Sequence, residues 1–199
     1  MKELINHYDL LIDEDNDPVH DPKPLRDYMD KWDGERFISS MELDKTKDVL
    51  EIGVGTGRLA VTVAPLCKSL CGIDISPKTV KRAAENLSSL SGVTLICDDF
   101  ISHRFSKKFH VIYSSLTFMH IKDKATAIKK VANLLEDNGL FVLSSDKDRS
   151  GYIDTGTRRL EVYPDDPEVI KHCLSDAGLA LIDEYDTEFA HVTVSRRVK

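Results

Sequence analysis

Short apolar runs alternate with helix-like segments from about Lys47 onward, and this alternation restricts the fold more than any other feature. The runs VLEIG (49–53), VIYSS (111–115) and LFVLSS (140–145) are nearly continuous in apolar character rather than alternating in polarity. Such runs are typical of strands buried on both faces, as in a parallel sheet. Repetition of strand and helix with parallel strands implies right-handed crossovers, so we predict a doubly wound α/β fold.

The individual elements can be placed from the same pattern. Strands are expected at 48–53, 69–75, 93–98, 109–115 and 140–145, and helices at 25–41, 58–66, 76–90, 123–135 and 165–177. The helix at 76–90 begins with Ser76 at the N-cap and Pro77 in the first turn. Asn138-Gly139 is expected to end the helix at 123–135 in a turn. Residues 179–195 are typical of a terminal hairpin, and 146–163 form a long connection of a kind that is usually functional or mobile.

Composition argues against several classes of partner. The balance of 27 basic and 34 acidic residues gives a net charge of −7, which disfavours nucleic acid as a partner. No apolar run approaches the roughly 20 residues needed to span a bilayer, so we expect no membrane partner. Residues 1–17 lack the apolar core of a signal peptide, so the cytoplasm is the expected location. The sequence carries no readable indication of oligomeric state.

The four cysteines do not suggest a metal site. Cys67, Cys71, Cys97 and Cys173 show no zinc-type pairing in the sequence. Free cysteine behaves as a small hydrophobic residue, so we expect buried, reduced thiols and no metal.

A glycine loop lies where the first strand of the core ends and a helix begins. It runs Glu51-Ile52-Gly53-Val54-Gly55-Thr56-Gly57-Arg58. Glycines there let the backbone turn sharply and approach a ligand closely, although a tight structural turn is the alternative. The dinucleotide-binding fingerprint GxGxxG begins in the same way, but its third glycine position falls on Arg58. Here the glycines occupy every second position, and an acid precedes them.

Two further acids end the next two strands. Asp74 closes the second strand and Asp98 the third, and the carboxyl ends of neighbouring parallel strands face one crevice. Asp74 is suited to accept hydrogen bonds from both ribose hydroxyls of a nucleoside. Its alternative role is to cap the following helix, but Ser76 is the better N-cap. Asp98 is suited to an adenine amino group, with Phe100 or Ile75 beside the ring; a strand-end turn is its alternative.

The charge of this loop and its acids favours one class of cofactor. Three acids facing a ligand are poorly suited to a pyrophosphate. They suit a cofactor that lacks phosphate and carries a sulfonium and an ammonium, because opposite charges attract strongly in a partly dry cleft. The pattern therefore favours S-adenosylmethionine (SAM) over NAD.

Taken together, these segments resemble the class I SAM-dependent methyltransferases over about residues 47–195. VLEIGVGTGRLA resembles the first motif of that family, GIDIS the second, and CDDF the adenine-contacting turn. FHVIYSSLTFMHI is similar to the strand and loop on the methionine side, and NLLEDNGLFVLS to the helix, turn and fifth strand. His110 departs from the family pattern, because such sequences often have an aspartate at this position. The position lies at the end of the strand that is far from the cofactor.

The resemblance implies a seven-stranded, mostly parallel sheet with an antiparallel last strand. It also implies backbone contacts from Gly53, Gly55 and Gly57, side-chain contacts from Asp74 and Asp98, and Ser114 to Leu116 near the sulfur or the amino-acid end. The complete predicted cofactor set is Glu51, Gly53, Gly55, Thr56, Gly57, Arg58, Asp74, Ile75, Asp98, Asp99, Phe100, Ser114 and Leu116.

We therefore expect a methyltransferase with SAM as methyl donor and an unidentified acceptor. We treat 1–199 as one domain, with an N-terminal helical lid segment at 1–46 and a catalytic core at 47–199. The first helix and the 146–163 connection suggest a partly covered pocket, and hence a small-molecule acceptor. A SAM-binding sensor or subunit without catalysis, and a nucleotide-binding oxidoreductase, are the alternatives.

No catalytic residue is assigned. His120 is the best-placed base, but a structural histidine packed among Phe118, Met119 and Ile121 is the favoured interpretation. Tyr28 and Trp32 share one helix face and either cover the cofactor or pack in the core. Arg158 and Arg159 either recognise an anionic acceptor or lie on the solvated surface. Further possible bases, which the sequence does not rank, are His20, Tyr113, Tyr152 and Asp154.

Overall fold

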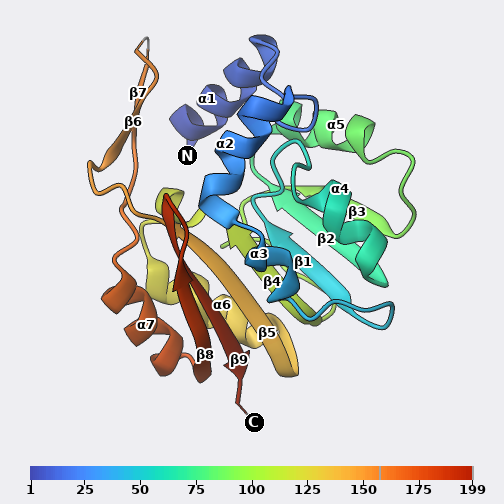
Figure 1. Ribbon diagram of the computed structural model, residues 1–199, viewed down its shortest axis with the longest axis vertical. Coiled ribbons are helices and arrows are strands. Elements are labelled where there is room, and N and C mark those ends of the chain that lie inside the picture. Colours follow the sequence, from blue (N-terminus) through green and yellow to red (C-terminus); the bar gives the residue numbers. More distant parts are fainter. Residues whose placement is uncertain (157, 199) are drawn as a thin grey trace.

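A seven-stranded sheet forms the centre of the computed structural model, which describes residues 1–156 and 158–198 (Figure 1). Its strand order is β3-β2-β1-β4-β5-β9-β8. Strands β1 to β5 pair in parallel, and β9 runs antiparallel to both β5 and β8. The predicted doubly wound sheet with an antiparallel last strand is confirmed. The strands are β1 (Asp48–Ile52), β2 (Ser69–Asp74), β3 (Val93–Cys97), β4 (Phe109–Ser115), β5 (Leu135–Asp146), β8 (Leu179–Asp186) and β9 (Ala190–Arg197).

Helices cover both faces of the sheet. The helices associated with the core are α3 (Arg36–Ser39), α4 (Ala60–Val63), the 3-10 turn η1 (Ala64–Leu66), α5 (Pro77–Asn86), the 3-10 turn η2 (Phe118–His120), α6 (Lys124–Leu134) and α7 (Pro167–Asp176). Val49 of β1 packs in the same apolar cluster as Phe37 of α3, whereas the next residue, Leu50, packs with Ile128 of α6 and Leu174 of α7. This double burial explains why the strands are continuously apolar.

The predicted helix start at Ser76 is confirmed. The Ser76 hydroxyl accepts a hydrogen bond from the Thr79 backbone N–H, as an N-cap residue should. The helix ends at Asn86 rather than continuing to residue 90.

The prediction for Asn138-Gly139 is wrong. The preceding helix ends at Leu134, and the chain turns directly into β5, so the dipeptide lies inside a strand. Asn138 has a φ of 63°, and the pairing of β4 with β5 shifts register between Phe109 and Val111. Asn tolerates the left-handed region, and here that conformation accommodates an irregularity within the strand. It does not end a helix.

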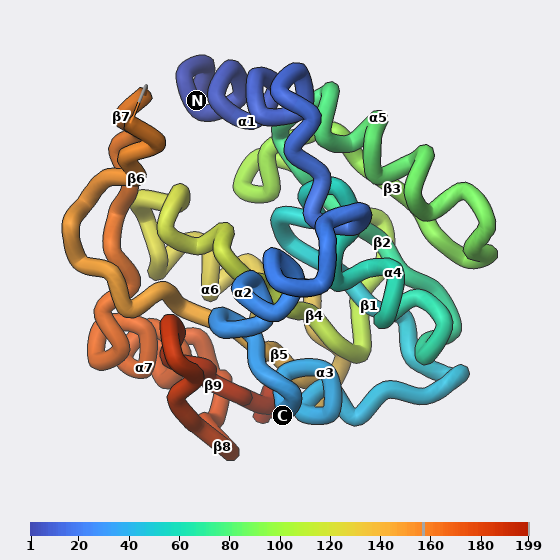
Figure 2. Tube along the Cα trace, turned by 45° about the horizontal axis from the view of Figure 1, so that its top comes forward, coloured from blue at the N-terminus to red at the C-terminus, as the bar shows by residue number. Residues whose placement is uncertain are grey.

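The N-terminal region contains more helix than predicted. Helix α1 (Lys2–Asp13) was not expected, and the predicted helix at 25–41 is divided into α2 (Lys23–Asp33) and α3 at Gly34, whose φ is 70°. Figures 1 and 2 both show α1 lying beside α5. The Asp9 carboxylate of α1 accepts hydrogen bonds from the Ser76 hydroxyl at 2.7 Å and from the Lys78 N–H at 3.1 Å.

The long connection after β5 contains a hairpin. Strands β6 (Tyr152–Asp154) and β7 (Arg159–Glu161) pair antiparallel and project beside α1 (Figure 1). The Arg158 guanidinium donates to both carboxylate oxygens of Glu14, at 2.9 and 2.7 Å. The hairpin is therefore tied to the region just after α1.

The four cysteines differ in burial. Cys67 and Cys71 are buried free thiols, as predicted, and Cys173 is partly buried. Cys97 is exposed, which corrects the expectation for this residue, because it ends the edge strand β3. Within residues 1–156 and 158–198, no group of His, Cys, Asp and Glu is arranged to hold a metal ion. In the same part of the chain, no helix has the length and apolar character needed to cross a membrane.

Candidate cofactor and acceptor site

A cavity of about 510 Å³ lies between the carboxyl ends of the central strands and the N-terminal helices. We call its two sides the sheet wall and the helix wall. The sheet wall comprises the ends of β1, β2 and β3 with the loops that follow them, and the loop after β4. The helix wall comprises Met1, Leu4, Tyr8, Leu11, Ile12, Leu25, Tyr28 and Met29, and the segment between α1 and α2 adds Asn16, Pro18 and Asp21.

The glycine loop brings its backbone close to both a neighbouring loop and the cavity. Gly53 has a φ of 77°, and a Cβ there would lie 1.9 Å from the Thr117 hydroxyl oxygen. Gly55 has a φ of 55°, and its Cβ would meet no atom within 4 Å. The loop is thus closed against Thr117 on one side and open for a ligand at Gly55.

The Asp74 carboxylate joins the glycine loop to the end of β2. It accepts hydrogen bonds from the Gly55 N–H and the Ser76 N–H, both at 3.0 Å. Burial raises the pKa of this carboxyl, and the backbone N–H groups around it oppose the rise. Each carboxylate oxygen retains capacity for a further hydrogen bond, so Asp74 can accept from a ligand in the cavity.

Glu51 is a buried acid at the methionine side of the predicted site. Its side chain lines the cavity and accepts a hydrogen bond at 2.7 Å from the Tyr113 hydroxyl, on the neighbouring strand β4. Burial raises the pKa of Glu51 to about 8, although the Tyr113 hydrogen bond and the positive charge of Arg58 favour the ionised form. A cationic ligand beside Glu51 would be stabilised by the carboxylate.

The raised pKa of Glu51 predicts that affinity for SAM increases with pH up to about 8. Below that pH the free carboxyl is largely protonated, and a bound cation favours its ionisation. Binding therefore releases a proton, and affinity should rise with pH by up to about tenfold per unit. Calorimetry in buffers of different ionisation enthalpy measures the released proton. Glu51→Gln should remove this release, and a pH slope that persists in this variant would contradict the assignment.

The turn after β3 also faces the cavity. Asp98, Asp99 and Phe100 all line it, together with Ile75. The Asp98 carboxylate lies 2.8 Å from the His103 Nδ1, and this hydrogen bond lowers the pKa of Asp98. Asp99 caps the turn by accepting from the Ile101 N–H and the Ser102 N–H, so its carboxylate supports the loop. The predicted neighbourhood of an acid and flanking apolar side chains is present.

Several other predicted residues have different surroundings from those expected. Arg58 lines the cavity, but its guanidinium pairs with Asp33 of α2 at 2.5 Å. Gly57 and Ser114 do not line the cavity. The Ser114 hydroxyl donates to the Ile52 carbonyl, because side chains alternate along β4 and Ser115 is the one that faces the cavity.

The loop after β4 contributes residues with strained or unusual geometry. Leu116 and Thr117 line the cavity, and Leu116 has a φ of 55°, which is uncommon for a leucine. Backbone strain of this kind is often found at functional sites. Leu116 and Thr56 complete the predicted residues that lie at the cavity.

His120 lines the cavity and pairs with a residue that sequence reasoning missed. Its Nε2 lies 2.6 Å from the hydroxyl oxygen of Tyr8 on α1. Burial, followed by the charges of His7 and Lys124, lowers the pKa of His120 to about 4. The spacing of Leu4, Tyr8 and Leu11 on one helical face could have indicated α1, but not its partner.

The remaining candidate bases and cations do not line the cavity. His20 is exposed and contacts Asn86, Tyr113 is buried against Glu51, and Tyr152 and Asp154 belong to the β6–β7 hairpin. Arg158 pairs with Glu14, and Arg159 stacks on the Tyr152 ring at 3.4 Å. Neither arginine is therefore placed to bind an acceptor in this cavity.

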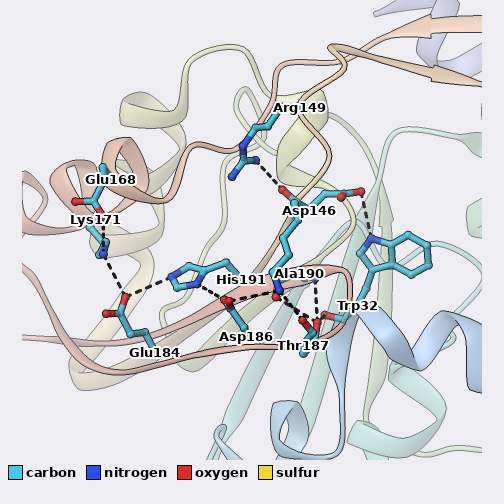
Figure 3. Close-up of polar contacts among 11 residues, drawn as sticks. Trp32, Asp146, Arg149, Glu168, Lys171, Glu184, Asp186, Thr187, Ala190 and His191 are labelled. Carbon is cyan, nitrogen blue, oxygen red and sulfur yellow. Dashed lines mark hydrogen bonds and ion pairs between the residues drawn. The ribbon is translucent and has the colours of Figure 1, made fainter.

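Helix α2 is anchored through Trp32 on the carboxyl end of β5. The indole N–H donates to Asp146 at 3.1 Å (Figure 3). The Trp32 ring centroid lies 4.7 Å from that of Phe189. The Ser144 hydroxyl donates to the Trp32 carbonyl at 2.6 Å. Trp32 thus packs on the core, whereas Tyr28 lines the cavity.

Comparison with known proteins shows the family. Residues 49–139 match the family described as "Methyltransferase domain". An uncharacterized methyltransferase of Bacillus velezensis is 30% identical over 157 residues, which cover 77% of this chain and 67% of that protein. This chain belongs to the class I SAM-dependent methyltransferases. SAM is the methyl donor of that family, which confirms the predicted cofactor.

Other relatives share the fold over much of the chain. The crystal structure of the N-methyltransferase NodS from Bradyrhizobium japonicum WM9, with bound S-adenosyl-L-homocysteine (SAH), superposes with a TM-score of 0.70 at 20% identity. The match covers 92% of this chain and 95% of the NodS chain. An uncharacterized methyltransferase of Schizosaccharomyces pombe is 28% identical over 139 residues. The match covers 49% of the length of that protein. For two further curated relatives, from Anoxybacillus flavithermus and Ilyobacter polytropus, it covers 56% and 38% of their lengths.

The residues of the sheet wall fit a cofactor of this kind. The open space at Gly55 accommodates a ligand near the backbone, and Asp74 has acceptor capacity for hydroxyl groups. Glu51 supplies a buried carboxyl for a positive charge, and Ile75 and Phe100 supply apolar surface near Asp98.

Proposed function

We propose that this protein transfers the methyl group of SAM to a small-molecule acceptor. The observation that carries the proposal is a single cavity with two chemically different walls. One wall holds the glycine loop and the acids Glu51, Asp74 and Asp98, and the other is formed by α1 and α2. A cofactor on the sheet wall leaves the helix wall for an acceptor.

Each group of the cofactor has a proposed partner on the sheet wall. Glu51 would face the ammonium and sulfonium charges, and Asp74 would accept from the ribose hydroxyls. Asp98 would accept from the adenine amino group, with Phe100 or Ile75 beside the ring. Gly53 and Gly55 would border the methionine part of the cofactor. Gly57 and Ser114 do not line the cavity, so they would act only by supporting the glycine loop and β4.

The helix wall supports the choice of a small acceptor. We take residues 1–46 as a helical lid segment over a catalytic core at 47–199 within one domain. Asp9 and Asp13 hold α1 on α5, and Trp32 holds α2 on the sheet, so both helices lie across the cavity. A covered cavity of about 510 Å³ is in the range of small-molecule sites. A similar protein from Ilyobacter polytropus is named as a malonyl-[acyl-carrier protein] O-methyltransferase, and the structurally similar NodS is named as an N-methyltransferase.

Catalysis by these residues would rest mainly on positioning. When bound, SAM supplies a methyl group on a good leaving group, and an acceptor lone pair forms the new bond as the carbon–sulfur electron pair returns to sulfur. An acceptor that carries an N–H or O–H also loses a proton to water or a neighbouring base. The two walls hold donor and acceptor in line, which can contribute roughly 7–11 kcal/mol to lowering the barrier.

Calorimetric titration with SAM, SAH and NAD tests the cofactor assignment, with Asp74→Ala as the variant. Loss of a hydrogen bond to a charged acceptor should weaken SAM binding by about 1.5–3 kcal/mol, or roughly ten- to a hundredfold. NAD should not bind. Cys97→Ser, an exposed change outside the cavity, serves as the control. A folded wild-type protein that binds neither SAM nor SAH would contradict the proposal.

Turnover is then measured by following SAH release during incubation with extracts of small metabolites and, separately, with intact tRNA and protein. Release that depends on a metabolite fraction supports the proposed acceptor class. Methylation of tRNA or protein alone would contradict it, and binding without turnover in every fraction would indicate a SAM-binding sensor or subunit.

A further inference from the structure

The two walls of the cavity differ sharply in charge. The acids Glu51, Asp74 and Asp98 line the sheet wall. The part of the helix wall contributed by α1 and α2 is largely apolar. Its apolar side chains are Met1, Leu4, Leu11, Ile12, Leu25 and Met29.

The cavity offers an anionic acceptor no unpaired lysine or arginine side chain. Among the described residues that line it, Arg58 is the only lysine or arginine. Its guanidinium already pairs with the buried Asp33 at 2.5 Å. A carboxylate or phosphate in this cavity would therefore lose its hydration, gain no free lysine or arginine partner, and face the acids of the sheet wall.

One polar pair stands against this apolar background. The Tyr8 hydroxyl and the His120 ring are in contact at 2.6 Å, and both side chains line the cavity. The other ring nitrogen of His120, Nδ1, is buried and has no hydrogen-bond partner among the described residues. Burial keeps the imidazole uncharged near neutral pH, since its pKa is lowered to about 4.

This pair has hydrogen-bonding capacity left for a ligand. If Nε2 carries the proton, it donates to the Tyr8 oxygen, and the Tyr8 hydroxyl hydrogen is free to donate. If Nε2 is unprotonated, it accepts from Tyr8, and the Tyr8 oxygen retains a lone pair that can accept. Tyr8 can therefore meet either a donor or an acceptor group while His120 holds its ring in place.

We propose that the helix wall binds an uncharged, largely apolar acceptor whose nucleophilic nitrogen or oxygen hydrogen-bonds to Tyr8, with His120 as the residue that positions Tyr8. This inference rests on the methyl-transfer function proposed above. The apolar body of the acceptor lies along α1 and α2, and its nucleophilic atom lies between Tyr8 and the cofactor. Burial of Tyr8 and the nearby charge of Asp74 raise the pKa of its hydroxyl, which therefore stays protonated.

The test is calorimetric titration of the SAH-saturated protein near neutral pH with four matched probes. These are 4-butylaniline, 4-butylphenol, 4-butylbenzoate and butylbenzene, which share one apolar body and differ only in the head group. The aniline and the phenol should bind about tenfold more tightly than butylbenzene, because each gains a buried hydrogen bond. The benzoate should bind most weakly of the four, since it is the only anion.

Variants then assign the head-group preference to the pair. Tyr8→Phe should reduce binding of the aniline and the phenol to the level of butylbenzene, while SAH affinity is unchanged. His120→Asn should also weaken binding of the aniline and the phenol, but to a smaller extent, because it removes only the hydrogen bond that holds Tyr8 in position. Tyr152→Phe, outside the cavity, is the matched control and should leave all four affinities unchanged.

The outcomes separate this inference from the proposed function. Failure of the wild-type protein to bind SAH would overturn the proposed function itself. Normal SAH binding with benzoate bound as tightly as the aniline, or with no probe bound, would overturn the acceptor class alone. A head-group preference that survives Tyr8→Phe would overturn the role of the pair.

Discussion

Replacing Gly53 by alanine should abolish SAM binding and lower the free energy of unfolding by about 2–6 kcal/mol. Gly53 has a φ of 77°, which an alanine adopts only with strain. The added Cβ would also lie 1.9 Å from the Thr117 hydroxyl oxygen and 2.6 Å from its methyl carbon. Relief of that clash has to move either the glycine loop or the loop after β4, and both border the cavity. Urea denaturation and calorimetry with SAM measure the two effects.

Gly178→Ala is the matched control for this variant. Gly178 has a φ of 76°, almost the same as Gly53, but a Cβ there would meet no atom within 4 Å. It lies between α7 and β8, outside the cavity. Gly178→Ala should therefore show only the cost of the left-handed backbone, about 1–3 kcal/mol, and normal SAM binding. Equal losses of stability in both variants, with SAM binding retained in Gly53→Ala, would show that the contact with Thr117 is unimportant.

Replacing Lys124 by methionine should destabilise the protein by about 3–5 kcal/mol. The Lys124 ammonium pairs with Asp165 at 2.5 Å, and both side chains are almost fully buried. It also donates to the carbonyls of Phe118 and Tyr163, and so joins η2, which carries His120, to the segment before α7. Methionine keeps most of the volume but leaves the Asp165 carboxylate buried without its partner. Urea denaturation at neutral pH measures the loss.

A second substitution distinguishes the ion pair from the packing around it. Burial lowers the pKa of Lys124 and raises that of Asp165, so each charge is costly without the other. The double variant Lys124→Met, Asp165→Leu should recover most of the lost stability, because no uncompensated charge remains. Lys171→Met, which removes a surface partner of Glu168 and Glu184, should change stability little. A Lys124→Met variant as stable as the wild type would rule out the pair as a structural element.

The sheet wall could be predicted because its parts are local in sequence. Glu51, the glycines and Asp74 each lie at the end of an apolar run, and the rule for parallel sheets brings such ends together. The cavity accordingly contains Glu51, Gly53, Gly55, Asp74 and Asp98, although their contacts with SAM remain a prediction. Errors of a single residue remained, since Ser115 and not Ser114 faces the cavity in β4.

The helix wall could not be predicted in the same way because it depends on long-range contacts. Tyr8 and His120 are 112 positions apart, and no local spacing relates them. Arg58 looked like a cofactor contact within its motif, but Asp33, on a helix that precedes the sheet, pairs with it. The spacing of apolar residues could have indicated α1 but not its partners, because the helix lies against the cavity, α5 and the hairpin after β5.

The sequence by itself therefore determined the buried parallel strands of the sheet and the chemical character of the cofactor side. Those features follow from apolar periodicity, turn residues and the position of acids at strand ends, all of which act over a few residues. Tertiary structure alone decided which side chains cover the cavity and which charges are already paired. Burial removes water from groups such as Glu51, His120 and Arg58, so their charge state and partners depend on every element packed around them.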